Sequence, residues 1–153
     1  MELAAKYGLR DYPAPAGGCR LTEPNYASRL QDLKDHEGLT DLAAIRLLRV
    51  GRHFRLSSAV KAVIGRNQAD NAFLDDHPAP GAFVLKADGV PGPTCILSAG
   101  ASEEQVRLAA SLCARYGDSQ PDKPVAILVR SSQGVRRVEA LRASQEEISR
   151  LMI

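Results

Sequence analysis

Apolar residues recur at helical spacing through the first third of the chain and at strand spacing after it. Thr22 and Pro24 are typical of the start of a helix, because proline is tolerated in the first helical turn, and Gly38 ends that helix. Thr40 is expected to cap a second helix with similar apolar spacing. The sequence therefore predicts a helical arm over residues 1–51.

After this arm the apolar pattern changes to short strands that come in pairs, with a helix after each pair. The expected strands occupy residues 53–56, 60–64, 83–87, 94–97, 125–130 and 135–141. Serine capping boxes begin two of the helices, at Ser102 and Ser144. Tight turns join the strands of each pair, which makes the pairs antiparallel. The predicted fold class is α+β, in which a helical N-terminal arm precedes antiparallel strand pairs alternating with helices over residues 52–153.

Composition and length narrow the function classes. At 153 residues the chain is long enough for one domain with an appended arm. Trp is absent and there are three Phe and four Tyr, so a surface of stacked aromatic rings is not expected. The His and Cys residues are too scattered for a zinc site, and no metal is predicted. The chain has neither an apolar run of about 20 residues nor the apolar core of a signal peptide, so we expect a cytoplasmic protein without a membrane partner.

Positive charge is concentrated in one part of a chain whose net charge is only +2. No Asp or Glu occurs from Leu42 to Ala69. The candidate phosphate-binding side chains in this stretch are Arg46, Arg49, Arg52, His53, Arg55, Lys61 and Arg66. A local field of one sign attracts a polyanion even when the whole chain is nearly neutral. The same pattern is also expected of a solvated basic face that binds nothing, and charge alone leaves both interpretations open.

The turn that follows the second expected strand carries the sharpest local motif. Gly65 permits a tight change from strand to helix. Asn67 is a good cap for a helix over residues 68–75, and the free N–H groups at such a helix start suit an anionic oxygen. Arg66 stands beside the cap, where its guanidinium can donate two hydrogen bonds to a phosphate. The alternative is a simple capped turn with Arg66 in solvent.

At these residues the sequence resembles a known family. Gly65, Arg66 and Asn67, together with Asn71 and Leu74, resemble the opening of the RNA-binding domain of NFACT proteins, called NFACT-R. The resemblance covers about residues 52–140. It implies an RNA partner for the cations of the acid-free stretch and for Asn67.

The N-terminal third resembles a junction found in a bacterial subfamily. Residues 12–24 and 48–56 are similar to the segment in which a PP-loop ATPase domain, related to tRNA thiouridine synthases, leads into an NFACT-R-like domain. This resemblance implies tRNA binding in the service of tRNA thiolation. The chain has no Ser-Gly-Gly-x-Asp-Ser loop, so we expect no cofactor in this segment and no tRNA adenylation by it alone. ATP would bind only in a PP-loop ATPase domain, supplied in cis or in trans.

Cys19 is the one candidate catalytic residue. It follows Gly17 and Gly18 and precedes Arg20, and a neighbouring cation lowers a thiol pKa and favours the thiolate. Enzymes that thiolate tRNA deliver sulfur through a cysteine persulfide, which implies a sulfur-carrier role for Cys19. The alternative is a small packed residue in a loop. Three functions therefore stay open: a tRNA-binding domain, a sulfur-transfer half-site, and a module that docks an acidic protein.

Overall fold

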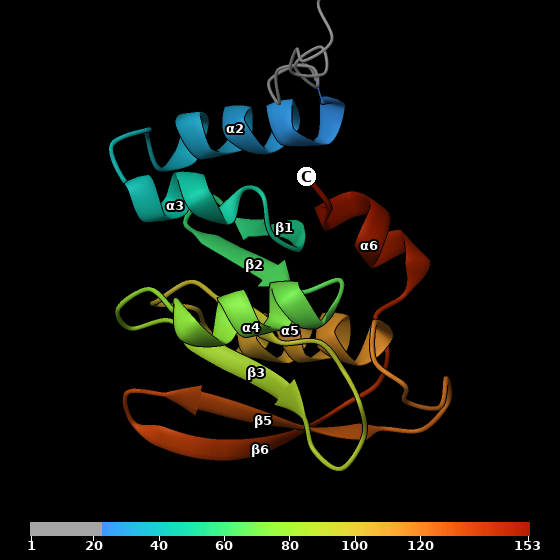
Figure 1. Ribbon diagram of the computed structural model, residues 1–153. Helices are drawn as coiled ribbons and strands as arrows, with labels where there is room; N and C mark the ends of the chain where they lie inside the picture. Colours follow the sequence, from blue (N-terminus) through green and yellow to red (C-terminus); the bar gives the residue numbers. More distant parts are fainter. Residues whose placement is uncertain (1–22) are drawn as a thin grey trace, which may run out of the picture.

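A computed structural model describes residues 23–153 of the chain (Figure 1). The helices are α2 (Pro24–His36), α3 (Leu42–Leu47), α4 (Gln68–Asp76), α5 (Glu103–Arg115) and α6 (Gln145–Leu151). The strands are β1 (Arg52–Ser57), β2 (Val60–Ile64), β3 (Phe83–Ala87), β4 (Cys95–Leu97), β5 (Val125–Ser131) and β6 (Gly134–Ala140). The α+β class with a helical N-terminal segment is confirmed.

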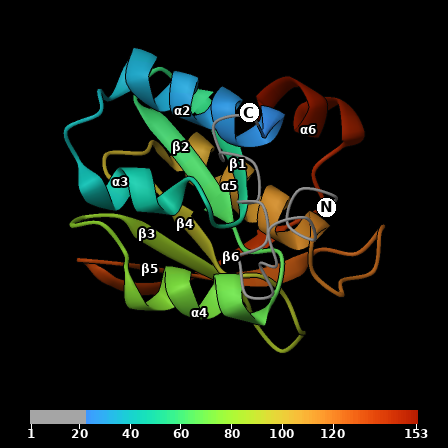
Figure 2. The same ribbon diagram turned by 45° about the horizontal axis from the view of Figure 1, so that its top comes forward.

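All six strands join one antiparallel sheet in the order β1-β2-β4-β3-β5-β6. Helices cover both faces: α3 and α4 lie on one side, and α5 lies behind the strands (Figures 1 and 2). The larger apolar core forms between the sheet and α5, around Phe54, Leu85 and Leu112. A smaller core, which includes Val63 and Leu74, lies on the α4 side. The domain therefore has three layers, with the sheet in the middle.

Helix α2 packs against the β1–β2 end of the sheet. Leu33 is its fully buried apolar contact, Asp32 of the helix pairs with Arg55 on β1, and Glu37 at the C-cap lies 3.5 Å from Lys61 on β2. The cap of α3 differs from the prediction: Asp41 rather than Thr40 is the cap residue, and its carboxylate accepts a hydrogen bond from the Ala43 N–H at 2.8 Å. Asp41 provides a charged acceptor one residue closer to the helix start, where a carboxylate also favours the helix dipole.

The C-terminus closes one edge of the sheet. Met152 forms an isolated bridge with Phe54, and the Ile153 N–H donates to the His53 carbonyl at 3.0 Å. These bonds satisfy main-chain groups of β1 that an uncovered edge strand would present to solvent. Between residues 23 and 153, no helix has the length and apolar character needed to cross a membrane.

Candidate RNA-binding surface

The turn between β2 and α4 is held by a close approach of two residues. A Cβ on Gly65 would lie 2.0 Å from the Asn71 Oδ1 atom, so any larger residue would displace the Asn71 side chain. That oxygen accepts a hydrogen bond from the Thr94 N–H at 3.0 Å and ties α4 to the start of β4. Gly65 does not have a positive φ, so its role is to leave room for Asn71 and not to supply left-handed backbone.

Arg66 and Asn67 are bound into the start of α4. The Asn67 side chain accepts from the Asp70 N–H at 2.9 Å, which confirms the predicted cap. One Asp70 oxygen accepts from the Arg66 Nε at 2.8 Å and from the Gly51 N–H at 3.1 Å. Burial acts to raise the pKa of Asp70, but the hydrogen bonds from Arg66 and Gly51 outweigh it and the pKa is lowered. The Arg66 guanidinium is thereby oriented, and 42% of its side chain stays exposed.

A hollow of about 260 Å³ lies where the start of α4, β1 and the end of α5 meet. Its side-chain lining consists of two cations, three amides, one aromatic ring and one proline: Arg52, Arg66, Asn67, Gln68, Asn71, Tyr116 and Pro93. No Asp or Glu lines it. The guanidinium carbon of Arg52 lies 4.4 Å from the centre of the Tyr116 ring, and its Nη1 donates to the Gly65 carbonyl at 3.4 Å. Such a hollow favours anions, because two guanidinium groups meet at its wall and the carboxylate that pairs with Arg66, that of Asp70, lies outside the lining.

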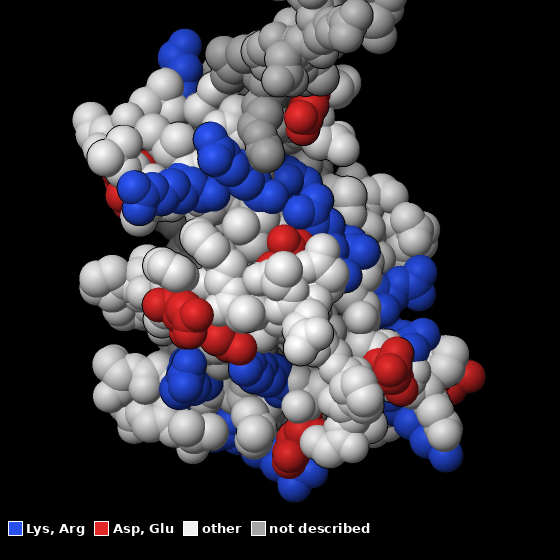
Figure 3. Space-filling view, in the orientation of Figure 1, with Lys and Arg blue, Asp and Glu red and all other residues white. Residues whose placement is uncertain are grey.

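Lys and Arg side chains form a band across the same face, over α3 and the segment that leads into β1 (Figure 3). Arg46 and Arg49 are exposed, and neither forms an ion pair within residues 23–153. The band connects to the hollow, because Arg66 Nη2 donates to the Arg49 carbonyl at 3.2 Å. Arg29 of α2 adjoins it through a bond from Nη1 to the Leu48 carbonyl at 3.1 Å.

His53 does not belong to this surface, and its predicted phosphate contact is wrong. Its side chain is 0% exposed, and Nε2 donates to the Val50 carbonyl at 2.9 Å. Burial lowers the pKa of His53 to about 3, and the positive charges of Arg29 and Lys61 act in the same direction. The imidazole is therefore neutral near pH 7 and has no route to a ligand in solvent.

Arg55 and Lys61 are likewise turned away from solvent, against the prediction. Arg55 is held by α2: its Nε donates to Asp32 Oδ1 at 3.0 Å and its Nη2 to Glu37 Oε1 at 2.9 Å. Lys61, 6% exposed, lies 3.5 Å from the same Glu37 oxygen. Burial is the largest influence on the Lys61 pKa and lowers it, while the Glu37 charge opposes this. Both cations are neutralised within the fold, because α2 places acids over a sequence stretch that contains none.

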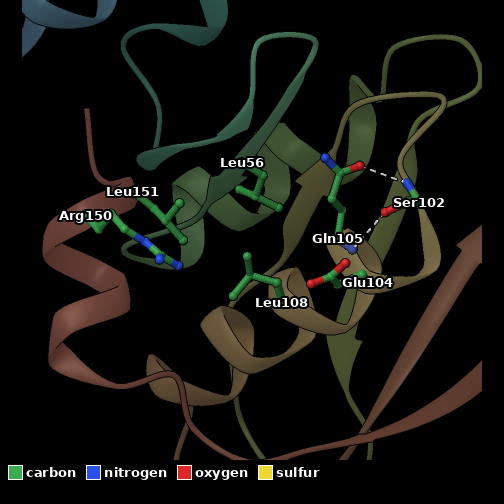
Figure 4. A pocket seen from close by; sticks show the side chains of 7 residues that line it. All are labelled: Leu56, Ser102, Glu104, Gln105, Leu108, Arg150 and Leu151. Carbon is green, nitrogen blue, oxygen red and sulfur yellow. Dashed lines mark hydrogen bonds between the residues drawn. The ribbon is translucent and has the colours of Figure 1, made fainter.

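A second hollow, of about 400 Å³, lies between α5, α6 and the end of β1 (Figure 4). Its lining is mixed, with Leu56 and Leu108 beside Glu104 and Arg150. Two of its polar side chains are already occupied, because Ser102 and Gln105 bond each other's main chain in the predicted capping box. The smaller, acid-free hollow is therefore the stronger candidate for a binding site.

Sequence reasoning missed three residues of the surface: Arg29, Gln68 and Tyr116. Tyr116 ends the predicted α5 segment, but nothing in the local pattern indicates that it meets Arg52.

Cys19 lies outside the described residues. Cys95 and Cys113 are buried, and burial raises the pKa of Cys113 to about 12, as expected of packed thiols. Within residues 23–153 no cluster of His, Cys, Asp or Glu could hold a metal ion.

The fold and site define an α+β domain with a hollow that two arginines and no acids line. The family described as NFACT protein RNA binding domain matches residues 51–152. The chain therefore belongs to the family of NFACT RNA-binding domains.

A solved structure of the C-terminal part of the fibronectin/fibrinogen-binding protein from Streptococcus suis is similar in fold. Its TM-score is 0.60 at 15% sequence identity, and the match covers 82% of this chain and 66% of that one. At this identity the likeness concerns the fold alone. No curated protein sequence matches the chain significantly.

Proposed function

We propose that this domain binds tRNA in the cytoplasm through the basic band and the hollow beside it. The observation that carries the proposal is the convergence of guanidinium groups from α3, the segment after it, β1 and the turn before α4 on one face (Figure 3). These groups are Arg46, Arg49, Arg52 and Arg66. Arginine suits this role, because its planar fork donates two parallel hydrogen bonds to a phosphate.

Structured RNA fits this surface better than an extended single strand. Unstructured strands are held largely by bases that stack on exposed aromatic rings. The five aromatic side chains between residues 23 and 153 are all buried or half-buried. Double-stranded RNA is read by shape and by contacts to phosphate and 2′-OH groups, for which a band of cations is sufficient.

The decisive variant is Arg46→Glu combined with Arg49→Glu. Both side chains are exposed and free of ion pairs within the described residues, so the fold should tolerate their reversal. The reversal puts two negative charges where phosphates would lie, and tRNA affinity should fall by at least about tenfold at moderate salt. Fluorescence polarisation with labelled tRNA measures this.

Arg107→Glu combined with Arg150→Glu is the matched control. It carries the same change of charge on α5 and α6, away from the proposed surface. Equal loss of affinity in both double variants would indicate nonspecific attraction and contradict the proposal. In the Arg46/Arg49 double variant the slope of log affinity against log salt should also become shallower, by about one for each phosphate that the protein no longer binds. The slope of the Arg107/Arg150 variant should not change.

Specificity for tRNA, and a role in tRNA thiolation, are the finer part of the proposal. They are supported by the resemblance of residues 12–24 and 48–56 to the junction that follows a PP-loop ATPase domain. On this view the domain presents tRNA to such an ATPase domain, which binds ATP, while this segment itself needs no cofactor.

Three measurements test this context. Competition between tRNA and a simple RNA hairpin tests specificity. The level of thiolated tRNA in cells with and without the gene, measured by gel retardation with an organomercury reagent, tests the pathway. Mass spectrometry of Cys19 after incubation with a sulfur donor tests the sulfur-carrier role. Unchanged levels of thiolated tRNA would contradict the role in thiolation but not RNA binding. Capture of an acidic protein from nuclease-treated extract, together with no measurable RNA binding, would instead favour a protein-docking module.

A further inference from the structure

The hollow has a chemistry that the basic band lacks. The band offers cations alone, which are sufficient for phosphate. The hollow adds a flat wall, because the Arg52 guanidinium lies over the Tyr116 ring and both groups line it. Guanidinium planes and aromatic rings are the surfaces against which unstacked RNA bases pack.

Amide side chains also line the hollow. Gln68, in the first turn of α4, is exposed, and its side chain makes no hydrogen bond within residues 23–153. An amide offers both a donor and an acceptor. The edge of a nucleobase presents both kinds of partner, whereas a phosphate oxygen only accepts. Gln68 is therefore better matched to a base than to a phosphate.

The size of the hollow sets the extent of the ligand. At about 260 Å³ it falls just below the range of about 300–1,000 Å³ typical of small-molecule pockets. It is also open to solvent, and Arg66 in its lining contacts the main chain of Arg49 in the basic band. These features suit one nucleotide that remains part of a longer strand bound outside.

We propose that the hollow takes a single unpaired nucleotide of the bound RNA. Its base packs against the Arg52–Tyr116 stack, its edge bonds Gln68, and its phosphate contacts Arg66. The inference rests on the proposed function, because the band holds the paired part of the RNA. It adds that the domain selects RNA with a bulged or looped-out nucleotide over a continuous duplex.

The test compares two RNA hairpins that differ by one bulged nucleotide in an otherwise fully paired stem. Affinities are measured by fluorescence polarisation at one salt concentration. The unmodified protein should prefer the bulged hairpin by about tenfold, the lower part of the range for one stacked base. Arg52→Lys keeps the charge but removes the planar group, and Gln68→Ala removes the amide; each should bring the ratio of the two affinities toward one.

Two control variants distinguish the nucleotide pocket from general RNA binding by the basic band. Tyr116→Phe keeps the ring and should retain the preference, while Gln133→Ala removes an exposed amide from the β5–β6 turn and should leave it intact. Equal binding of both hairpins by the unmodified protein, or a preference that survives Arg52→Lys and Gln68→Ala, overturns the nucleotide pocket while RNA binding stands. Failure to bind either hairpin overturns the proposed function and the pocket with it.

Discussion

Two groups of cations from one acid-free stretch have opposite environments in the folded domain. Arg52 and Arg66 line an open hollow, whereas Arg55 and Lys61 are covered by α2 and neutralised by Asp32 and Glu37. Arg52 and Arg55 both belong to β1 but point to opposite faces, because side chains alternate along a strand and the two positions are three residues apart. Arg52 points to the side of Tyr116 and α5, and Arg55 to the side of α2.

A charge is available to a ligand where the fold leaves its side chain exposed: Arg66 pairs with Asp70 but stays 42% exposed, whereas Arg55 is only 13% exposed. Arg55 and Lys61 lie directly opposite each other on β1 and β2. Two like charges in such a cross-strand pair repel each other, so the position is stable only with acids close by. Asp32 and Glu37 supply them, from a helix that precedes the matched part of the chain. Arg55 and Lys61 therefore help to hold α2 on the sheet, whereas Arg52 and Arg66 remain accessible to RNA.

The largest effect on stability is expected from removing the Arg55–Asp32 ion pair, which α2 covers. Arg55→Leu leaves the Asp32 carboxylate, 11% exposed, without its main partner. Removing one partner of a largely buried pair should lower the free energy of unfolding by about 3 kcal/mol. Urea denaturation at pH 7 measures the change. Arg107→Leu, which breaks the exposed pair with Glu103, should cost less than about 1 kcal/mol, and similar costs for both variants would contradict the contrast.

A smaller loss of stability is expected from a change in the Gly65 turn, which precedes Arg66. Gly65→Ala places a methyl group against Asn71 Oδ1 and should cost about 2 kcal/mol of stability. Because Asn71 also ties α4 to Thr94, the hollow should be displaced and RNA binding weakened. The cost of Gly65→Ala should shrink in an Asn71→Ala background, which removes the clashing atom. Equal costs in both backgrounds, compared in thermal melts, would contradict this packing.

The buried histidine predicts a pH dependence of stability that reaches intermediate size, about 1.4 kcal/mol, one pH unit below the ordinary histidine pKa. The unfolded chain takes up a proton on His53 below about pH 6.5, whereas the folded domain, with the pKa lowered to about 3, does not. Stability is therefore fully retained above pH 6.5 and lost as pH falls, by about 1.4 kcal/mol per pH unit. His53→Gln should flatten this dependence. Unfolding measured between pH 6.5 and 4.5 checks it, above the range where Asp32 and Asp70 titrate.

The smallest effect should come from the covered lysine. Lys61→Met removes a charge that is 6% exposed and should change RNA affinity by no more than about twofold. Arg49→Met, which removes an exposed charge, should weaken binding several times more. A larger loss from Lys61→Met than from Arg49→Met in polarisation titrations would place RNA on the face that α2 covers.

Local sequence predicted the elements well and the site in part. The cap at Asn67, the capping boxes at Ser102 and Ser144 and the strand pairs depend on residues a few positions apart, and they are confirmed. The surface depends on contacts between distant positions, such as Arg52 with Tyr116. The acid-free stretch indicated where cations gather but not that Asp32 and Glu37 pair with some of them.

The sequence by itself determined the α+β order of elements, the turn at Gly65 to Asn67 and the concentration of basic residues. These features depend on local backbone preference and on the spacing of apolar side chains. Only the tertiary structure decided which cations remain exposed to solvent, because burial and charge neutralisation depend on distance in space. It alone brought α2 over Arg55 and Lys61, and Tyr116 beneath Arg52, to separate a stabilising charge cluster from an open site.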